Sequence, residues 1–439
     1  MTRLLVALLL TAEAGTPGDV LTLSQALENC DDHQPLLVQA EANTEAAGAR
    51  VDEALGAYLP QVNGSAAFIY SQPFGSTSNG VSSVGVVGAA GAGGSGAVIG
   101  GSPSAAPRIS LGLTAYQLIY DFNQTLDKIR ASKASVAQYA YTQDEARVTT
   151  HLTVRSAYYN ARAEKSLLQV ARDTLDNEKK HLILTEAQIR VGVQPEIALA
   201  TEKATYSTDV YQEINAEGTY ATGKSQLNQA MGIEGPIDYE VQAVDAPPVQ
   251  GEDRTTDQLM EQALQARPAY LAAVKQVDAQ ALLVAAYRGN LFPNIYAEGG
   301  ILSSGEHLDN QTGNLFAELA LSWPIFNWTN INAIKEQRAD LLLYEGQRDQ
   351  LRQQIRVDLE TARLQVATYT SSVKAAQDGV VNAHEQLRLA EGRYQSGVGN
   401  IIELGDAQVA YTNSQVQEIQ AQFNLNNARA TLMAKLGQQ

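Results

Sequence analysis

The sequence predicts a mostly α-helical protein with a small β part, built from one unit that occurs twice. Three observations support this prediction: a repeat that spans nearly the whole chain, two very long helical runs, and four short segments with alternating apolar residues. Each long run holds about 67 residues, which as a helix would extend roughly 100 Å. A helix of that length excludes a compact globular core.

The repeat is visible as pairs of residues that recur at a constant spacing. Proline and aromatic positions near the start of each copy recur 233 residues later, and glycines near the end of each copy recur 205 residues later. The matched pairs include Pro35 and Pro268, Leu59 and Phe292, Gly192 and Gly397, and Gly232 and Gly437. The expected organisation is a signal peptide over 1–14, a first repeat over 15–232, a linker over 233–255 and a second repeat over 256–439.

Each repeat is predicted to contain the same elements in the same order. In the first repeat a helix is followed by strands over 61–71 and 108–119, a long helix over 124–190 and a helix over 196–231. In the second repeat a helix is followed by strands over 294–303 and 314–324, a long helix over 329–395 and a helix over 401–437. The first long run contains neither Gly nor Pro, and good helix formers dominate it. Alone, these helices also fit an ordinary coiled coil.

The four strand segments alternate apolar and small or polar residues, which is the pattern of a strand with one apolar face. Ile109, Leu111 and Leu113 illustrate it in the first repeat, and Leu315 and Leu319 in the second. Each segment has the length of a tilted transmembrane strand. Four strands cannot close on themselves, and open sheet edges are costly in hydrocarbon. Several copies of the chain would therefore have to share one cylinder.

Aromatic residues cluster near the ends of these segments, where an interfacial belt would lie in a membrane protein. They are Tyr70, Tyr116, Tyr120, Phe122, Trp323, Phe326 and Trp328. Ordinary core packing is the alternative, because aromatic residues also favour strands in soluble sheets. Between the first two strands, residues 71–107 are rich in Gly, Ser and Ala and carry no charge until Arg108. This composition predicts a long flexible surface loop or a constriction over a pore mouth, and a tolerated low-complexity insertion is the alternative.

The N-terminal sequence and the net charge of the chain restrict the class of protein further. Arg3, the apolar run Leu4–Leu10 and the Ala12-x-Ala14 site predict a secretory signal peptide, the alternative being a mis-assigned start. The chain has 48 acidic and 31 basic residues, a net charge of −17, which argues against nucleic acid as a partner. The lone Cys30 lies outside the signal sequence, so neither a disulfide nor a lipid anchor is expected there.

In combination, these features resemble the outer membrane efflux proteins of the TolC type. The resemblance is carried by the duplicated Ala-rich helix ending in Leu-Pro or Phe-Pro, by the strand ends LIYDF and PIFNW, and by the Gly-containing break in each helical pair. It implies long α-helical hairpins that form a periplasmic α-barrel, and four strands per chain in a 12-stranded transmembrane β-barrel of a homotrimer. It also implies a passive exit duct for efflux or type I secretion in the outer membrane of a Gram-negative bacterium.

The same resemblance assigns partners and site residues. A periplasmic adaptor and an inner membrane transporter would be partners, with outer membrane lipid around the strands and no cofactor. The helix-turn tips would dock the adaptor through Arg190, Val191, Gly192, Val193, Leu199, Ser396, Gly397, Val398 and Leu404. Tyr394 matches a gating tyrosine, whereas Ala198 and Gly399 replace its usual Asp partner and the neighbouring Arg, so a different closed-state contact is expected.

Two acidic residues form the remaining candidate site. Glu403 and Asp406 are three apart, share one helix face and match an acidic pair at the family's pore entrance. A ring of such carboxylates predicts cation preference. Alternatively, both acids merely complement the positive end of the helix that begins after Gly399.

No catalytic motif is present, and an enzyme is not expected. The five histidines are scattered without metal-ligand spacing, and Asp31, Asp32 and His33 beside Cys30 fit a solvated helix better than a metal site. Two rival classes stay open. A secreted coiled-coil scaffold or adhesin would show no conductance, and a one-chain porin would need many more strands than four.

Overall fold

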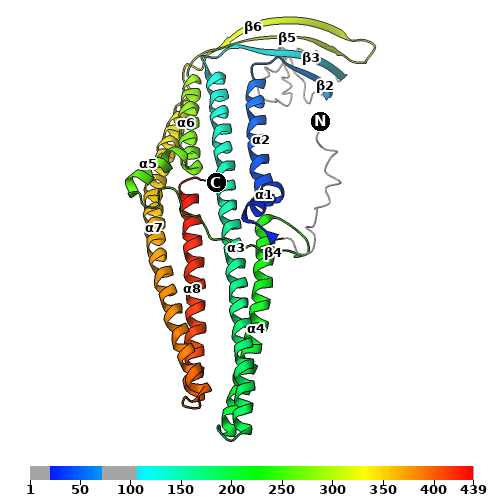
Figure 1. The fold of residues 1–439 in the computed structure, drawn as a ribbon. Helices are drawn as coiled ribbons and strands as arrows, with labels where there is room; N and C mark the ends of the chain where they lie inside the picture. Colours follow the sequence, from blue (N-terminus) through cyan, green and yellow to red (C-terminus); the bar gives the residue numbers. More distant parts are fainter. Residues whose placement is uncertain (1–19, 72–105, 439) are drawn as a thin grey trace. The chain divides into compact units, whose positions relative to one another are not determined.

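The computed structural model describes residues 20–71 and 106–438. The predicted signal peptide and nearly all of the Gly-rich segment 71–107 lie outside the described residues. The predicted mostly helical fold with a small β part is confirmed (Figure 1). The described residues form two compact units. The first contains the residues up to Gly48, Ala134–Asp278 and Leu342 onward, and the second contains Ala49–Lys133 and Ala279–Leu341.

The helices of the two repeats correspond closely in length and order. In the first repeat they are α1 (Leu23–His33), α2 (Pro35–Gly56), α3 (Gln124–Arg190) and α4 (Glu196–Met231). In the second repeat they are α5 (Thr256–Ala266), α6 (Pro268–Gly289), α7 (Trp328–Gln395) and α8 (Ile401–Lys435). Proline begins both α2 and α6, a position where its missing N–H costs no helical hydrogen bond.

Helices α4 and α8 end at glycines with the same conformation. Gly232 has φ +75° and Gly437 has φ +73°, in the left-handed region that other residues resist. A Cβ at Gly232 would lie 2.7 Å from the Cα of Gln34, and a Cβ at Gly437 would lie 2.8 Å from the Cα of Arg267. Each glycine therefore packs its backbone against a helix junction, α1–α2 or α5–α6. Because Gly437 stops the helix, α8 ends before the predicted residue 437.

The second compact unit contains a four-stranded antiparallel sheet in the order β2-β3-β5-β6. Its strands are β2 (Gln61–Ser71), β3 (Ala106–Tyr120), β5 (Asn294–Gly305) and β6 (Thr312–Ser322). Strand β6 begins and ends two residues before the predicted 314–324. The predicted end included Pro324, which has no N–H to donate to a neighbouring strand.

The register of the sheet sets apolar residues side by side on one face. Leu113 pairs with Ile301, and Ile301 pairs with Leu315 on the next strand. All three side chains are exposed. Strands β2 and β6 are the edges of the sheet, and no further strand pairs with them among the described residues. The sheet thus exposes an apolar face and two open edges.

The first compact unit has its apolar core in separate clusters along the helices. One cluster joins α1, α3 and α4 through residues such as Val154, Tyr158 and Leu227. Another joins α5, α7 and α8 through residues such as Leu259 and Leu359. The two clusters follow from the duplication, because equivalent helices pack in each repeat.

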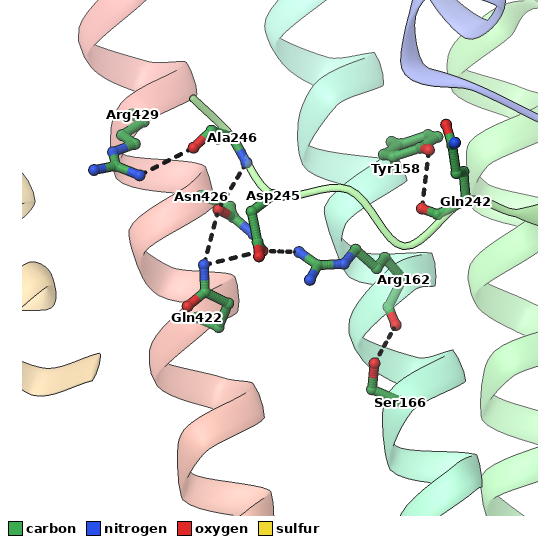
Figure 2. A network of polar contacts seen from close by, with 9 residues as sticks. All are labelled: Tyr158, Arg162, Ser166, Gln242, Asp245, Ala246, Gln422, Asn426 and Arg429. Atoms are coloured by element: carbon green, nitrogen blue, oxygen red, sulfur yellow. Dashed lines mark hydrogen bonds and ion pairs between the residues drawn. The ribbon is translucent and has the colours of Figure 1, made fainter. Parts of the chain in front are cut away.

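The segment between the repeats is held by polar contacts as well as by a short β pairing. Strand β4 (Glu240–Val241) pairs in parallel with β1 (Val20–Leu21). Figure 2 shows Asp245 in contact with Arg162 of α3 and with Gln422 and Asn426 of α8. Burial raises the pKa of Asp245, but these donors outweigh burial and lower the pKa overall. The linker therefore connects helices of both repeats.

Candidate functional site

The turns that end α3 and α7 have the same backbone hydrogen bonds. The Val193 amide donates to the Gln188 carbonyl at 2.9 Å, and the Val398 amide donates to the Arg393 carbonyl at 3.0 Å. Both are Schellman-type turns around a left-handed glycine, Gly192 at φ +79° or Gly397 at φ +75°. A Cβ at Gly397 would lie 3.8 Å from Val193 Cγ1, so the two turns are neighbours. We call these two turns the hairpin tips.

The hairpin tips expose most of the residues predicted to dock an adaptor. Arg190, Gly192, Ser396 and Gly397 are exposed, as are the apolar side chains of Val191, Val193 and Val398. Ile197 and Ile402, which the sequence interpretation omitted, add two more exposed apolar side chains. Leu199 is half-buried.

The prediction that Leu404 belongs to this exposed surface is wrong. Its side chain is 2% exposed and packs in an apolar cluster with Leu387, Ala390 and Tyr394. Its position in the first turn of α8 suggested a surface residue, but the helix turns this position inward. Leu404 therefore supports the hairpin tips from inside.

Tyr394 is a buried contact between α7 and α3 rather than an exposed latch. Its side chain is 1% exposed, and its hydroxyl lies 2.7 Å from the Thr185 hydroxyl. Gln188 Nε2 donates to the Tyr394 carbonyl at 3.3 Å. Burial raises the pKa of Tyr394, and nearby Glu202 raises it further. Thr185 thus takes the place of the acidic partner that the sequence lacks at Ala198, which is itself buried.

Gly399 is explained by a close backbone approach. A Cβ there would lie 3.0 Å from the Tyr394 amide nitrogen and 3.1 Å from Arg393 Cβ. The Gly399 amide also donates to the Arg393 carbonyl at 2.9 Å. A larger residue at this position would push the start of α8 away from the end of α7.

Glu403 and Asp406 are both exposed on the first turns of α8, and of the two only Glu403 forms an ion pair within the described residues. Glu403 Oε1 lies 3.2 Å from Arg393 Nε, and the Glu403 amide is capped by the Asn400 side chain at 2.8 Å. Helix capping and a role at a pore entrance are both compatible with this geometry. The acidic ring stays a prediction.

Asp406 borders a cavity that the sequence interpretation missed. The cavity measures about 350 Å³ and is lined by residues of α3, α4 and α8. Three carboxylic acids in it are buried: Glu178 and Glu202 are each 4% exposed, and Asp209 is 8% exposed. Acidic residues on a long helix usually face solvent, so the composition did not indicate that these three acids are buried. The available signal was the seven-residue spacing of Glu202 and Asp209, which puts both on one helix face.

The predicted aromatic residues do not all lie on one face of the sheet. Tyr70, Trp323, Phe326 and Trp328 are exposed, and Trp323 Nε1 donates to the Leu291 carbonyl at 3.2 Å. Tyr120 and Phe122 are exposed with ring centroids 4.9 Å apart. Tyr116 alternates with the exposed apolar residues of β3, so it lies on the opposite face, with its ring 5.2 Å from that of Tyr296.

The part of the chain that the structure describes, residues 20–71 and 106–438, contains neither a metal-binding cluster nor a helix that could span a membrane. No group of three or more His, Cys, Asp or Glu residues in this part could hold a metal ion. None of its helices combines the length and the apolar character that a membrane span requires.

Comparison with known proteins extends over nearly the whole chain. Residues 22–233 and 259–438 match the family model described as "Outer membrane efflux protein". CyaE of Bordetella pertussis is 22% identical over 425 residues, covering 96% of this chain and 85% of CyaE. TolC of Escherichia coli is 22% identical over 439 residues, covering 94% of this chain and 82% of TolC.

A solved structure supports the same fold. The outer membrane protein VceC of Vibrio cholerae superposes with a TM-score of 0.75 at 17% identity, covering 95% of this chain and 96% of VceC. The likeness includes both repeats, with the long helices and the strands between them. Since the family model matches most of the sequence, this chain belongs to the outer membrane efflux protein family, whose members are outer membrane channels and not enzymes.

Proposed function

We propose that three copies of this chain form an outer membrane channel that serves as the passive exit duct of a tripartite efflux or type I secretion system. The observation that carries the proposal is the four-stranded sheet, which exposes an apolar face and leaves both edges open. Three such sheets joined edge to edge would form a closed barrel of 12 strands. Family membership supports the same assembly.

Lipid is the partner that fits the exposed face of the sheet. Val62 and Phe68 on β2 and Leu315, Leu319 and Leu321 on β6 are all exposed. Each large apolar side chain contributes roughly 1.5–3 kcal/mol when it is removed from water. Unpaired edge groups in hydrocarbon cost several kcal/mol each, so insertion requires that β2 of one copy pairs with β6 of the next.

Exposed apolar residues on the helices favour further contacts between copies. Tyr211 and Ile214 are exposed on α4, and Val357, Leu364 and Val381 are exposed on α7. Contiguous exposed apolar surface on a long helix is typical of an interface. A neighbouring copy would cover these side chains and extend the duct below the membrane.

The hairpin tips are the proposed entrance and the docking surface for a periplasmic adaptor. They combine a rigid glycine turn with exposed valines, and apolar side chains at a turn suit a partner's shallow apolar groove. An inner membrane transporter would act through that adaptor. Glu403 and Asp406 would then line the entrance and favour cations.

The assembly is tested by a pair of charge substitutions on adjacent residues of β6. Leu319→Arg places a charge on the exposed apolar face and should abolish membrane insertion, because a lipid-facing Arg costs about 2–4 kcal/mol near the bilayer midplane. Ala320→Arg, on the opposite face, is the matched control and should insert normally. The readouts are the mass of the detergent-extracted particle and conductance in planar bilayers. A wild-type protein that is a water-soluble monomer without conductance would overturn the proposal.

The docking role is tested separately at the hairpin tips. Gly192→Glu or Gly397→Glu should abolish efflux in cells while the trimer still assembles. Gly218→Glu is the control, because Gly218 lies within α4 and a Cβ there meets nothing within 4 Å. Efflux that survives both tip substitutions would contradict the docking assignment.

The acidic ring is tested by ion selectivity. The double variant Glu403→Gln/Asp406→Asn should lose cation preference in single-channel recordings. Glu196→Gln is the matched control, because Glu196 is the acid in the first turn of α4 at the other hairpin tip. Unchanged selectivity in the double variant would leave the two acids with a helix-start role alone.

A further inference from the structure

The cavity beside the hairpin tips contains three buried acids that lack a Lys or Arg partner within the described residues. Glu178 projects from α3, and Glu202 and Asp209 project from α4. No Lys or Arg of the described chain forms an ion pair with any of the three. The only basic side chain of the described residues that pairs with one of these acids is His181, 4.0 Å from Glu178.

Several oxygen atoms in the cavity also lack a hydrogen-bond donor. Glu178 Oε1, Glu202 Oε2 and Gln408 Oε1 are buried without a partner in the described part of the chain. Gln408 belongs to α8 and is 7% exposed. Acceptors from three helices that face one cavity without donors can be satisfied by protons on the acids, since a protonated carboxyl becomes a donor.

The environment raises the pKa of two of these acids, Glu178 and Asp209. Burial, the contact with Glu202 and the charges of Glu202 and Asp209 together raise the pKa of Glu178 to about 9. Burial and the charge of Glu202 also raise the pKa of Asp209. Desolvation disfavours each charge, and the like charges disfavour one another.

We propose that Glu178, Glu202 and Asp209 form a proton-binding site that holds the hairpin tips closed when protonated and loosens them when it ionises. The proposal rests on the proposed channel function, because it makes the entrance of the duct sensitive to pH. Burying the acids as charges would require water or a cation to enter the cavity. Separation of α8 from α3 and α4 would enlarge the cavity and hydrate the charged acids more fully.

Other titratable groups face the site from the surrounding helices. His181 of α3 lies 4.0 Å from Glu178 and 3.6 Å from Glu391 of α7. Asp406 of α8 borders the same cavity, and Tyr394 of α7 senses the charge of Glu202. The Tyr394–Thr185 contact between α7 and α3 therefore lies within the electrostatic reach of the cavity.

The direction of the pH dependence follows from the raised pKa of Glu178. Its contribution to closed packing is complete below its ordinary value of 4.5 and is lost as pH rises toward about 9. Acid should therefore tighten the hairpin tips, and alkaline pH should loosen them. This trend is opposite to that of a carboxylate held by a salt bridge.

Hydrogen–deuterium exchange of the full-length protein in detergent tests the proposal directly. After correction for intrinsic exchange, protection of the amides in 178–190 and 387–398 should fall at least roughly tenfold from pH 5 to pH 9, since one unit of pKa shift corresponds to a tenfold change. The variant Glu178→Gln/Glu202→Gln/Asp209→Asn keeps the shapes of the three side chains but removes their titratable groups. Its amide protection should therefore not change between pH 5 and pH 9. Glu186→Gln, on the exposed side of α3, should behave as wild type.

Two further measurements separate the possible failures. Single-channel open probability should rise with pH in the wild type and stay flat in the triple variant. His181→Asn should keep the pH dependence above pH 7, which attributes it to the carboxylates. Conductance with unchanged pH dependence in the triple variant, or protection that does not vary with pH in the wild type, would overturn the proton-binding site. Absence of any conductance would instead contradict the proposed function, and the exchange data would still decide the proton-binding site.

Discussion

The two hairpin tips share a backbone but differ in their side chains. Gly192 and Gly397 occupy the same left-handed position, and the same pattern of amide-to-carbonyl hydrogen bonds closes both turns. The residues 205 positions apart differ in chemistry. Ile189 corresponds to Tyr394, and Ala198 corresponds to Glu403.

The difference extends into the helices that follow. Glu202 and Asp209 of α4 correspond to Ala407 and Ser414 of α8, so the buried acids occur in the first repeat only. The buried Tyr394 and the exposed Glu403, whose amide is capped by Asn400, occur in the second repeat only. The two repeats therefore share the backbone conformation that the turn requires, whereas the side chains around the hairpin tips differ. The comparison predicts that substitutions at the shared glycines reduce stability equally in the two repeats. Substitutions at side chains that differ between the repeats should have unequal effects.

The largest effect is expected at the glycines that end α4 and α8. Gly232→Ala and Gly437→Ala combine a left-handed backbone, costing about 1–2 kcal/mol, with overpacking against a helix junction, costing about 1–3 kcal/mol. Each should lower the free energy of unfolding by about 3 kcal/mol in denaturant titrations. Gly218→Ala, in an open helical position, is the control and should be neutral or slightly stabilising. A large loss of stability from only one of the two substitutions would contradict the expectation that the repeats behave equally.

The next largest loss of stability is expected at the buried Tyr394, which has no counterpart in the first repeat. Tyr394→Phe removes the hydrogen bond to Thr185 and leaves that hydroxyl unpaired, at a cost of about 1–2 kcal/mol. Thermal unfolding and exchange of the α3 amides near Thr185 would measure it. The double variant Tyr394→Phe/Thr185→Val should recover part of the loss, because no polar group is then left unpaired. Equal stability of the single variant and wild type would show that this contact does not hold the helices together.

A smaller and symmetric effect is expected at the hairpin tips. Gly192→Ala and Gly397→Ala face open space or ordinary van der Waals contact, so only the left-handed backbone is penalised, by about 1 kcal/mol each. Proteolysis at the hairpin tips and denaturant unfolding should detect the two changes equally. A difference of more than about 1 kcal/mol between them would mean that neighbouring side chains, and not the shared turn, decide the stability of the hairpin tips.

The smallest effect is expected at the exposed ion pair of the second hairpin tip. Glu403→Gln removes the contact with Arg393, and an exposed pair contributes about 0.5 kcal/mol or less. Raising the salt concentration should erase the difference from wild type in thermal unfolding, because screening weakens exposed charges. A loss that persists at high salt would indicate that the carboxylate caps α8 instead.

Much of the candidate site follows from local sequence signals. The glycine breaks could be predicted because turns and helix starts depend on neighbouring residues. Tyr394, Glu403 and Asp406 were singled out by the family resemblance. The roles of Thr185 and Glu178 could not be predicted from local sequence in the same way. Their roles depend on side chains from other helices, and a polar residue on a long helix has no local mark that distinguishes burial from exposure.

The sequence by itself determined the repeat, the lengths of the long helices and the alternation of the four strands, because each depends on periodicity and on where Gly and Pro occur. Only the tertiary structure decided that the compact units each draw on both repeats, that Leu404 faces inward, and that three acids share one cavity. The physical reason is that burial depends on which helices pack together. The sequence periodicity of a helix shows which of its faces is apolar. It does not show which other helix packs against that face.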